Sequence, residues 1–242
     1  MDAEGRTQLP LAHEDDLCVA RVPLFRGLSH ADQREVAAVA RPTRVSRDEI
    51  IYPAGSDLGQ LLVVHTGRVK ISRVGRDGHE QIIRVLEPGD FVGESAFLGG
   101  GRSDHQASAL EAGSMCVFRH ADLGRLLAAH PSIGLRMLQD VSRRLEETEA
   151  RLAAATTGDV SSRVAGYLLS LPGRRGEGGA HGTLEVTLPL TKKDIASLLD
   201  TTPESLSRAL RRLSDSEVID QPSGSRVSLL DVDALVTLAD GD

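Results

Sequence analysis

The sequence predicts an α+β chain in which an antiparallel β-roll (jelly roll) is followed by a long helix and a C-terminal winged helix-turn-helix. Three observations predict this fold class. Short β-rich segments alternate with glycine and aspartate turns over residues 43–119, an apolar helical stripe runs through 131–157, and two short capped helices precede a hairpin pattern after residue 190. We therefore divide the chain into a flexible arm (1–16), the roll with flanking helices (17–130), the long helix (131–157) and the C-terminal domain (158–242).

The composition of the chain excludes several classes of function. Its 242 residues carry a formal net charge of −7, so any surface that binds nucleic acid must be local. Aromatic residues make up 2% of the chain, which argues against stacking platforms for single strands. No apolar run approaches the roughly 18 residues that span a bilayer. The start "MDAEGRTQLPLAHEDD" is unlike a signal peptide, so we expect a cytoplasmic protein with no membrane partner.

The N-terminal half of the chain changes from a helical to a β-rich sequence pattern. Residues 17–40 have helical spacing, with Ser29 as an N-cap before "HADQREVAAVA". The segments "LLVVHTGRVKI", "QIIRVL", "DFVGE" and "MCVFR" then follow one another closely between turns. Several short strands at close spacing are typical of an antiparallel barrel or jelly roll.

The long helix carries a heptad stripe. Its members follow one another by three and four residues, and charged residues such as Arg143 and Glu147 surround them. A helix docked on its own roll would also bury such a stripe, but nothing nearby needs so long a helix, and we favour a dimer seam. The segment 171–182, "LPGRRGEGGAHG", is predicted to be a flexible loop. The seam residues are Leu138, Val141, Leu145, Thr148 and Leu152.

Two short helices after residue 190 have clear start signals. Thr191 precedes "KKDIASLL" as an N-cap, with Asp194 in the capping-box position. After a turn at 200–202, Thr202 caps a second helix that has Pro203 at its first position, where a missing N–H costs nothing. The order predicts a helix-turn-helix, and "VIDQPSGSRVSLL" (218–230) predicts a hairpin wing with Gly224 at its tip.

The second helix has an apolar and a polar face. Leucines recur along one face, whereas Glu204, Ser207 and Arg208 lie on the other, where a recognition helix meets base edges. A glutamate can accept from cytosine N4, and an arginine can bind guanine O6 and N7 with both arms, so we assign base contacts to these three residues. An ordinary helical hairpin with a solvated face is the alternative. Contacts to the DNA backbone are assigned to Lys192, Lys193, Thr202, Arg211, Arg212 and Arg226.

The motifs "PGDFVGESAFLGGGRSDHQASAL" and "LTKKDIASLLDTTPESLSRALRRL" resemble the CRP/FNR family of bacterial transcription regulators. The resemblance implies a roll of the cyclic-nucleotide-binding type, a homodimer, contact with RNA polymerase, and a palindrome with half-sites like TTGAT and ATCAA. The pattern Glu-x-x-Ser-Arg, formed by Glu204, Ser207 and Arg208, resembles that of the FNR branch of the family. Asp200 departs from the glycine of many members, but aspartate tolerates a left-handed backbone.

The family resemblance leaves the sensed signal open, and a cyclic nucleotide is one reading. Members that bind one use a Gly-Glu and an Arg-Ser pair for the ribose and the cyclic phosphate. The gap between the two pairs is shorter here, and Asp104-His105 interrupts the usual run. The effector residues implied are Gly93, Glu94, Arg102, Ser103 and, on the long helix, Thr148.

The two cysteines give a second reading. Cys18 and Cys116 are too few for a four-thiolate iron–sulfur cluster. Their positions resemble the two-cysteine Flp group of FNR-like proteins, in which thiol–disulfide exchange between the pair is thought to switch DNA binding. Closing a loop of about 100 residues can shift a conformational balance by roughly 4–5 kcal/mol. Two buried structural cysteines are the alternative.

A metal ion or haem is a third reading, and no cofactor is required by the sequence. Cys18, Cys116 and His105, with His13 and His120, offer thiolate and imidazole ligands, but no ligand spacing demands a site. An enzyme is not expected, because the chain has no H-x-H pair and no phosphate-binding glycine loop, and "GESAF" fails the G-x-S-x-G pattern. A module that binds only proteins is the other alternative to DNA binding. The presence of Glu204 and Arg208 on the polar face of the second helix argues against it.

Overall fold

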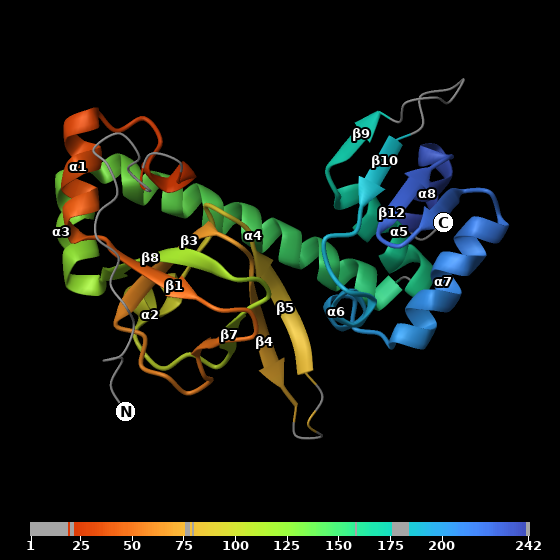
Figure 1. Cartoon of the computed structure of the whole chain (residues 1–242), viewed down its shortest axis with the longest axis horizontal. Helices are drawn as coiled ribbons and strands as arrows, with labels where there is room; N and C mark the ends of the chain where they lie inside the picture. Colours follow the sequence, from red (N-terminus) through yellow and green to blue (C-terminus); the bar gives the residue numbers. More distant parts are fainter. Residues whose placement is uncertain are drawn as a thin grey trace. The chain divides into compact units, whose positions relative to one another are not determined.

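The structure is a computed structural model that describes Val19 and residues 22–75, 78, 80–157, 159–175 and 184–240. The chain divides into two units, Met1–Ser142 and Arg143–Asp242, and each has its own hydrophobic core (Figure 1). The boundary falls inside the long helix α4 (Pro131–Thr157). The arm predicted over 1–16, and with it His13, lies outside the described residues, as does Cys18.

The N-terminal unit is a roll of two antiparallel sheets, which confirms the predicted jelly-roll fold. Buried residues such as Leu62, Val64, Ile71 and Met115 fill the space between the sheets. One sheet has the order β1 (Arg41–Val45), β8 (Gly113–Arg119), β3 (Gln60–Thr66) and β6 (Phe91–Val92). The other has the order β2 (Ile50–Tyr52), β7 (Gln106–Ala109), β4 (Val69–Val74) and β5 (Glu80–Leu86).

The flanking helices of the roll are shorter than the sequence predicted. Helix α1 (His30–Val39) begins at Ser29, whose hydroxyl accepts from the Asp32 N–H at 3.2 Å, so the predicted N-cap is confirmed. The helical reading from residue 17 is wrong for residues 22–28, where Pro23–Phe25 forms one 3₁₀ turn; most of 17–21 lies outside the described residues. Pro23 has no N–H to donate, and Gly27 has a φ of 82°, which ends helical geometry. Helices α2 (Glu94–Gly99) and α3 (His120–Ala129) complete the unit.

The C-terminal unit places its helices against a small sheet. Leucines of α7 and apolar residues of the sheet form one core cluster. The segment predicted as a loop over 171–182 contains strand β9, because Gly173 pairs with Val186 and leaves room for the Leu184 side chain. The sheet order is β11 (Ile219–Ser223), β12 (Arg226–Leu229), β10 (Leu184–Thr187) and β9 (Gly173–Arg175), with helices α5 (Val160–Ser170), α6 (Lys192–Leu198), α7 (Pro203–Asp215) and α8 (Val232–Asp240).

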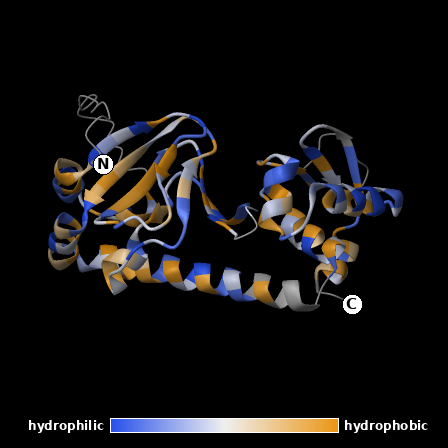
Figure 2. Cartoon of the chain, turned by 90° about the horizontal axis from the view of Figure 1, so that it is seen from below, coloured by the Kyte–Doolittle hydropathy of each residue, from blue (hydrophilic) through white to orange (hydrophobic). Residues whose placement is uncertain are grey.

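The pattern of hydropathy differs between the strands of the roll and the long helix α4. The strands of the roll are largely hydrophobic, whereas hydrophobic and hydrophilic residues alternate along α4 (Figure 2). Among the helices in the described part of the chain, none combines the length and the apolar character that a membrane crossing requires.

Candidate nucleic-acid interface and sensor region

The helix-turn-helix is fixed by side-chain caps at both helix starts. The Thr191 hydroxyl accepts from the Asp194 N–H at 3.2 Å, and the Thr202 hydroxyl accepts from the Ser205 N–H at 3.2 Å. Asp200 in the turn has a φ of 50°, the left-handed conformation that aspartate tolerates. The predicted caps and turn are therefore confirmed, and they set the direction in which α7 leaves the turn.

Helix α7 presents one apolar and one polar face. Leu206, Leu210 and Leu213 are buried in the core of the unit, where Ile195 of α6 is also buried. Glu204, Ser207 and Arg208, the assigned base-reading residues, are all exposed. Leucine burial fixes the rotation of α7, so these three side chains are held outward together.

A hydrogen bond that sequence reasoning missed orients Arg208. Its Nη2 donates to the Ser205 hydroxyl at 3.0 Å, one turn earlier on α7. The i, i+3 spacing was the sequence feature that could have indicated this contact. Of the five hydrogen-bond donors of the guanidinium, this contact uses one, and the group stays exposed.

The basic side chains around the helix-turn-helix differ in their surroundings. Arg226 on the wing lies 3.7 Å from Glu185, from its Nη1 to Oε1. The Ser162 backbone N–H and, more weakly, the charge of Arg212 lower the pKa of Asp159, so Arg212 lies within electrostatic range of α5. The residues assigned to the DNA backbone are exposed throughout: Lys192, Lys193, Thr202, Arg211, Arg212 and Arg226.

The predicted seam of α4 is largely open to solvent. Leu138, Leu145 and Leu152 are 63%, 57% and 65% exposed, whereas Ile133 and Met137 are buried against the roll. The N-terminal end of α4 thus docks on its own unit through a different face, and the heptad stripe is left uncovered. Of the other seam positions, Val141 is half-buried and Thr148 is exposed.

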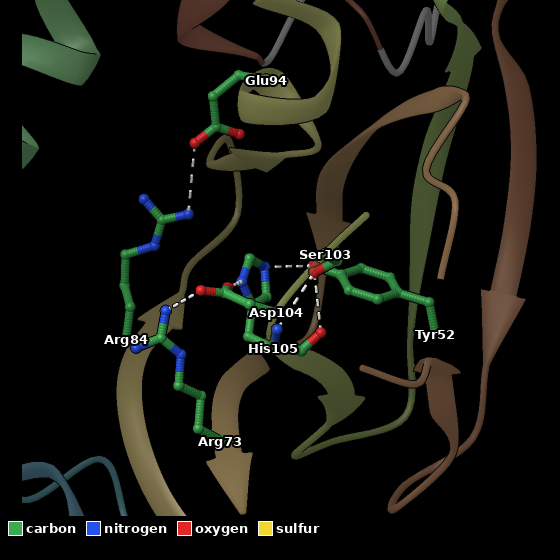
Figure 3. A network of polar contacts seen from close by, with 7 residues as sticks. All are labelled: Tyr52, Arg73, Arg84, Glu94, Ser103, Asp104 and His105. Atoms are coloured by element: carbon green, nitrogen blue, oxygen red, sulfur yellow. Dashed lines mark hydrogen bonds and ion pairs between the residues drawn. The ribbon is translucent and has the colours of Figure 1, made fainter. Parts of the chain in front are cut away.

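The residues implied for an effector have different contacts within the protein. Glu94 lies 3.9 Å from Arg84 of β5, from Oε1 to Nη2, a pairing that no motif indicated (Figure 3). Gly93, with φ 102°, is required sterically, because a Cβ there would lie 2.3 Å from the Gln60 carbonyl oxygen. Arg102 is exposed, and Ser103 donates from its hydroxyl to the His105 carbonyl at 2.9 Å. On α4, the Thr148 hydroxyl donates to the Arg144 carbonyl at 2.7 Å.

A chain of polar side chains runs through this part of the roll. His105 lies between Tyr52 and Asp104: its Nε2 is 2.9 Å from the Tyr52 hydroxyl and its Nδ1 is 3.0 Å from Asp104 Oδ1. Asp104 also pairs with Arg73 (Figure 3). Burial and the charge of Glu94 raise the pKa of Tyr52, and the His105 hydrogen bond lowers the pKa of Asp104. The two ring nitrogens of His105 thus connect the Tyr52 hydroxyl with the Asp104 carboxylate.

Cys116 lies in the apolar core of the roll. It is 2% exposed and shares a cluster with Phe25, Phe118 and Val19. The residue next to Cys18 in sequence therefore packs into the core that holds Cys116. The metal candidates Cys116, His105 and His120 belong to no group of three metal-ligating side chains within the described residues.

Comparison with known proteins agrees with this architecture. Residues 42–130 match the model of the cyclic nucleotide-binding domain, and residues 162–238 match the Crp-like helix-turn-helix domain. The chain is 32% identical over 198 residues to the CRP-like cAMP-activated global transcriptional regulator of Mycobacterium tuberculosis, covering 81% of this chain and 87% of that protein. It is 29% identical over 222 residues to the probable transcriptional regulator flp of Lacticaseibacillus casei, covering 92% and 98%.

Solved structures show the same fold. FixK2 from Bradyrhizobium japonicum matches with a TM-score of 0.68 and 24% identity over 83% of this chain and 97% of that one. A roll of this type followed by a Crp-like helix-turn-helix defines a DNA-binding transcription regulator. The chain belongs to the CRP/FNR family, a family of transcription regulators and not of enzymes.

Proposed function

We propose that this chain acts as a homodimer on an FNR-type palindrome, TTGAT-N4-ATCAA, and reads each half-site with α7. The observation that carries the proposal is the exposed triad Glu204, Ser207 and Arg208 on a helix whose opposite face is buried. Arg208 would hold a guanine and Glu204 would accept from a cytosine amino group. The exposed cations around the motif would bind phosphates, and RNA polymerase would be the protein partner that the family resemblance implies.

The homodimer is supported by the open stripe of α4. Three leucines more than half exposed on one helix are unfavourable in water, and pairing the stripe with a second copy would bury them. A heptad stripe also pairs two copies about a two-fold axis, and a two-fold dimer matches a palindromic site.

For the signal we propose thiol–disulfide exchange between Cys18 and Cys116. Val19 and Cys116 share one apolar cluster, which supports proximity of the two thiols. Oxidation would form the sulfur–sulfur bond with release of two protons and two electrons to an oxidant such as diamide or another disulfide. The similarity to the flp regulator of Lacticaseibacillus casei supports the same choice.

A cyclic nucleotide is the second candidate signal. The match to the cyclic nucleotide-binding domain and the cAMP-activated relative favour it. Against it, Glu94 already pairs with Arg84, and Ser103 already bonds to the His105 carbonyl.

Fluorescence anisotropy of a labelled TTGAT-N4-ATCAA duplex tests function and signal together. Protein is titrated under dithiothreitol, after diamide, and with cyclic AMP, at one fixed salt concentration because phosphate contacts make affinity salt-dependent. A redox-dependent shift that disappears in Cys18→Ser and in Cys116→Ser supports the thiol switch. A shift with cyclic AMP alone would overturn it, and equal weak binding to palindrome and scrambled duplex would overturn the DNA site.

A further inference from the structure

Three metal-ligating side chains converge where α1 meets the junction of α3 and α4. Asp32 and Glu35 stand one turn apart on α1, and His130 is the residue between α3 and α4. One donor atom from each lies within 4.8 Å of the other two, and His130 Nε2 is 3.2 Å from Glu35 Oε2. Figure 1 shows α1 and α3 side by side at this end of the roll.

We propose that Asp32, Glu35 and His130 bind a divalent first-row transition cation, with zinc as the reference ion. At metal–ligand distances of about 2.0–2.2 Å, two ligands of one tetrahedral ion lie roughly 3.3–3.6 Å apart. The His130–Glu35 separation is close to this value, and the 4.8 Å limit needs only small side-chain rotations. One imidazole with two carboxylates suits zinc, manganese or iron better than magnesium or calcium, which prefer ligands that are all oxygen.

The charge of the cluster also favours a cation. The cluster offers two carboxyl groups and one imidazole, and a metal ion binds these groups as carboxylates and neutral imidazole. Within the described residues, no lysine or arginine forms an ion pair with Asp32 or Glu35, and the ion pair of Glu35 is with His130. A divalent cation would therefore neutralise the cluster.

Backbone hydrogen bonds and buried side chains already fix the segments that carry the three donors. The His130 side chain is 14% exposed, its backbone N–H donates to the Leu126 carbonyl at 2.7 Å, and the Ile133 N–H donates to the His130 carbonyl at 3.0 Å. Val36 of α1 and Ile133 of α4 are fully buried in the same core cluster. The backbone N–H of Ser29 donates to Asp32 Oδ2 at 3.3 Å and orients that carboxylate. Glu35 is 60% exposed, so water can reach the open side and complete the coordination.

A bound ion would join two segments 95 residues apart in sequence, α1 and the start of the helix that carries the seam. The three proposed ligands include neither cysteine and no residue of α7, so the metal-binding test depends on neither the proposed DNA site nor the proposed thiol switch. A simple ion pair between His130 and Glu35 is the competing explanation. That pair would be stable without metal and would not bind one at defined stoichiometry.

Metal binding to the full-length, tag-free protein distinguishes the two. Equilibrium dialysis against buffered Zn²⁺, with the metal counted by mass spectrometry, is done in a Cys18→Ser/Cys116→Ser background so that thiols do not contribute. We expect about one zinc per protomer. Glu35→Gln and His130→Asn keep hydrogen-bonding side chains but remove a metal ligand. Each should lower the affinity for zinc at least about 100-fold, since even the loss of a residue that only hydrogen-bonds to a ligand lowers metal affinity 10–100-fold.

The matched control is His30→Asn, which removes an exposed imidazole from the same helix and should leave binding unchanged. Circular dichroism checks that each variant is folded, and Glu35 is exposed enough for its variant to fold. Cobalt in place of zinc gives a visible d–d band that should be lost in the same two variants. Absence of stoichiometric zinc binding, or zinc affinity in Glu35→Gln and His130→Asn equal to that of the parent protein, would overturn the proposal.

Discussion

Truncation of Arg208 is the most direct test of the proposed reading helix. Arg208 is exposed, and its guanidinium donates to the hydroxyl of the half-buried Ser205, so Arg208→Ala removes a side chain that is not part of the buried core. The expected loss is therefore the base contact itself, about 1–3 kcal/mol for a bidentate arginine–guanine pair. Two half-sites double this to about 2–6 kcal/mol, or roughly 30-fold to 10⁴-fold in affinity of the dimer for the palindrome.

The assay is a two-by-two anisotropy experiment. Wild type and Arg208→Ala are titrated against the palindrome and against a duplex in which the guanine of each half-site is replaced. If Arg208 reads that guanine, the wild type discriminates between the duplexes and the variant does not. Arg212→Ala is the control: it should weaken both duplexes alike and reduce the salt slope by about 2 for the dimer. An Arg208→Ala variant that still discriminates by the same factor would refute the assignment.

Three further predictions concern assembly and stability. Leu145→Glu should convert the dimer to monomer in light scattering, since it places a charge in the exposed stripe of α4; an unchanged mass would argue against the seam. Thr202→Ala should lower the free energy of unfolding by about 1 kcal/mol through loss of the α7 cap, measured by urea denaturation with Ser214→Ala as a control away from the cap. Burial raises the pKa of Glu80, but hydrogen bonds from Lys70, Ser72 and Gln106 outweigh it, so the folded-state pKa lies below the ordinary 4.5. Glu80→Gln should therefore cost stability at pH 7 and progressively less as the pH falls below 4.5, because the wild type loses that contribution there; a pH-independent difference would contradict the ionic origin.

Much of the fold could be predicted because its determinants are local. Ser29, Thr191 and Thr202 each cap a helix through a backbone N–H three residues later, a relation visible in the sequence. The same holds for the buried leucine face of α7, which follows from spacing alone. Strand β9 was missed because its pairing with β10 depends on a partner beyond a glycine-rich segment, and local propensity at Gly173 opposes a strand.

The sensor region could not be predicted to the same depth because its contacts join distant positions. Arg84 sits in a β-rich run with no motif, yet it is the residue that meets Glu94. Tyr52 and His105 lie 53 residues apart and form a hydrogen bond only because β2 and β7 are neighbours in one sheet. His130 likewise reaches Glu35 across 95 residues without any ligand spacing in the sequence.

These distant contacts bear on which signal the roll senses. A nucleotide that used Glu94 and Ser103 would meet a carboxylate that lies 3.9 Å from Arg84 and a hydroxyl that donates to the His105 carbonyl at 2.9 Å. A ligand that took over the Ser103 donor would break that hydrogen bond, at a cost of about 0.5–1.5 kcal/mol unless it is replaced. The proposed thiol switch would act on the apolar core of the roll. Cys116 is already buried there, and Val19, the neighbour of Cys18, is packed in the same cluster. Thiol exchange and nucleotide binding thus use different residues of the roll, and the dithiothreitol and cyclic AMP arms of one titration separate them.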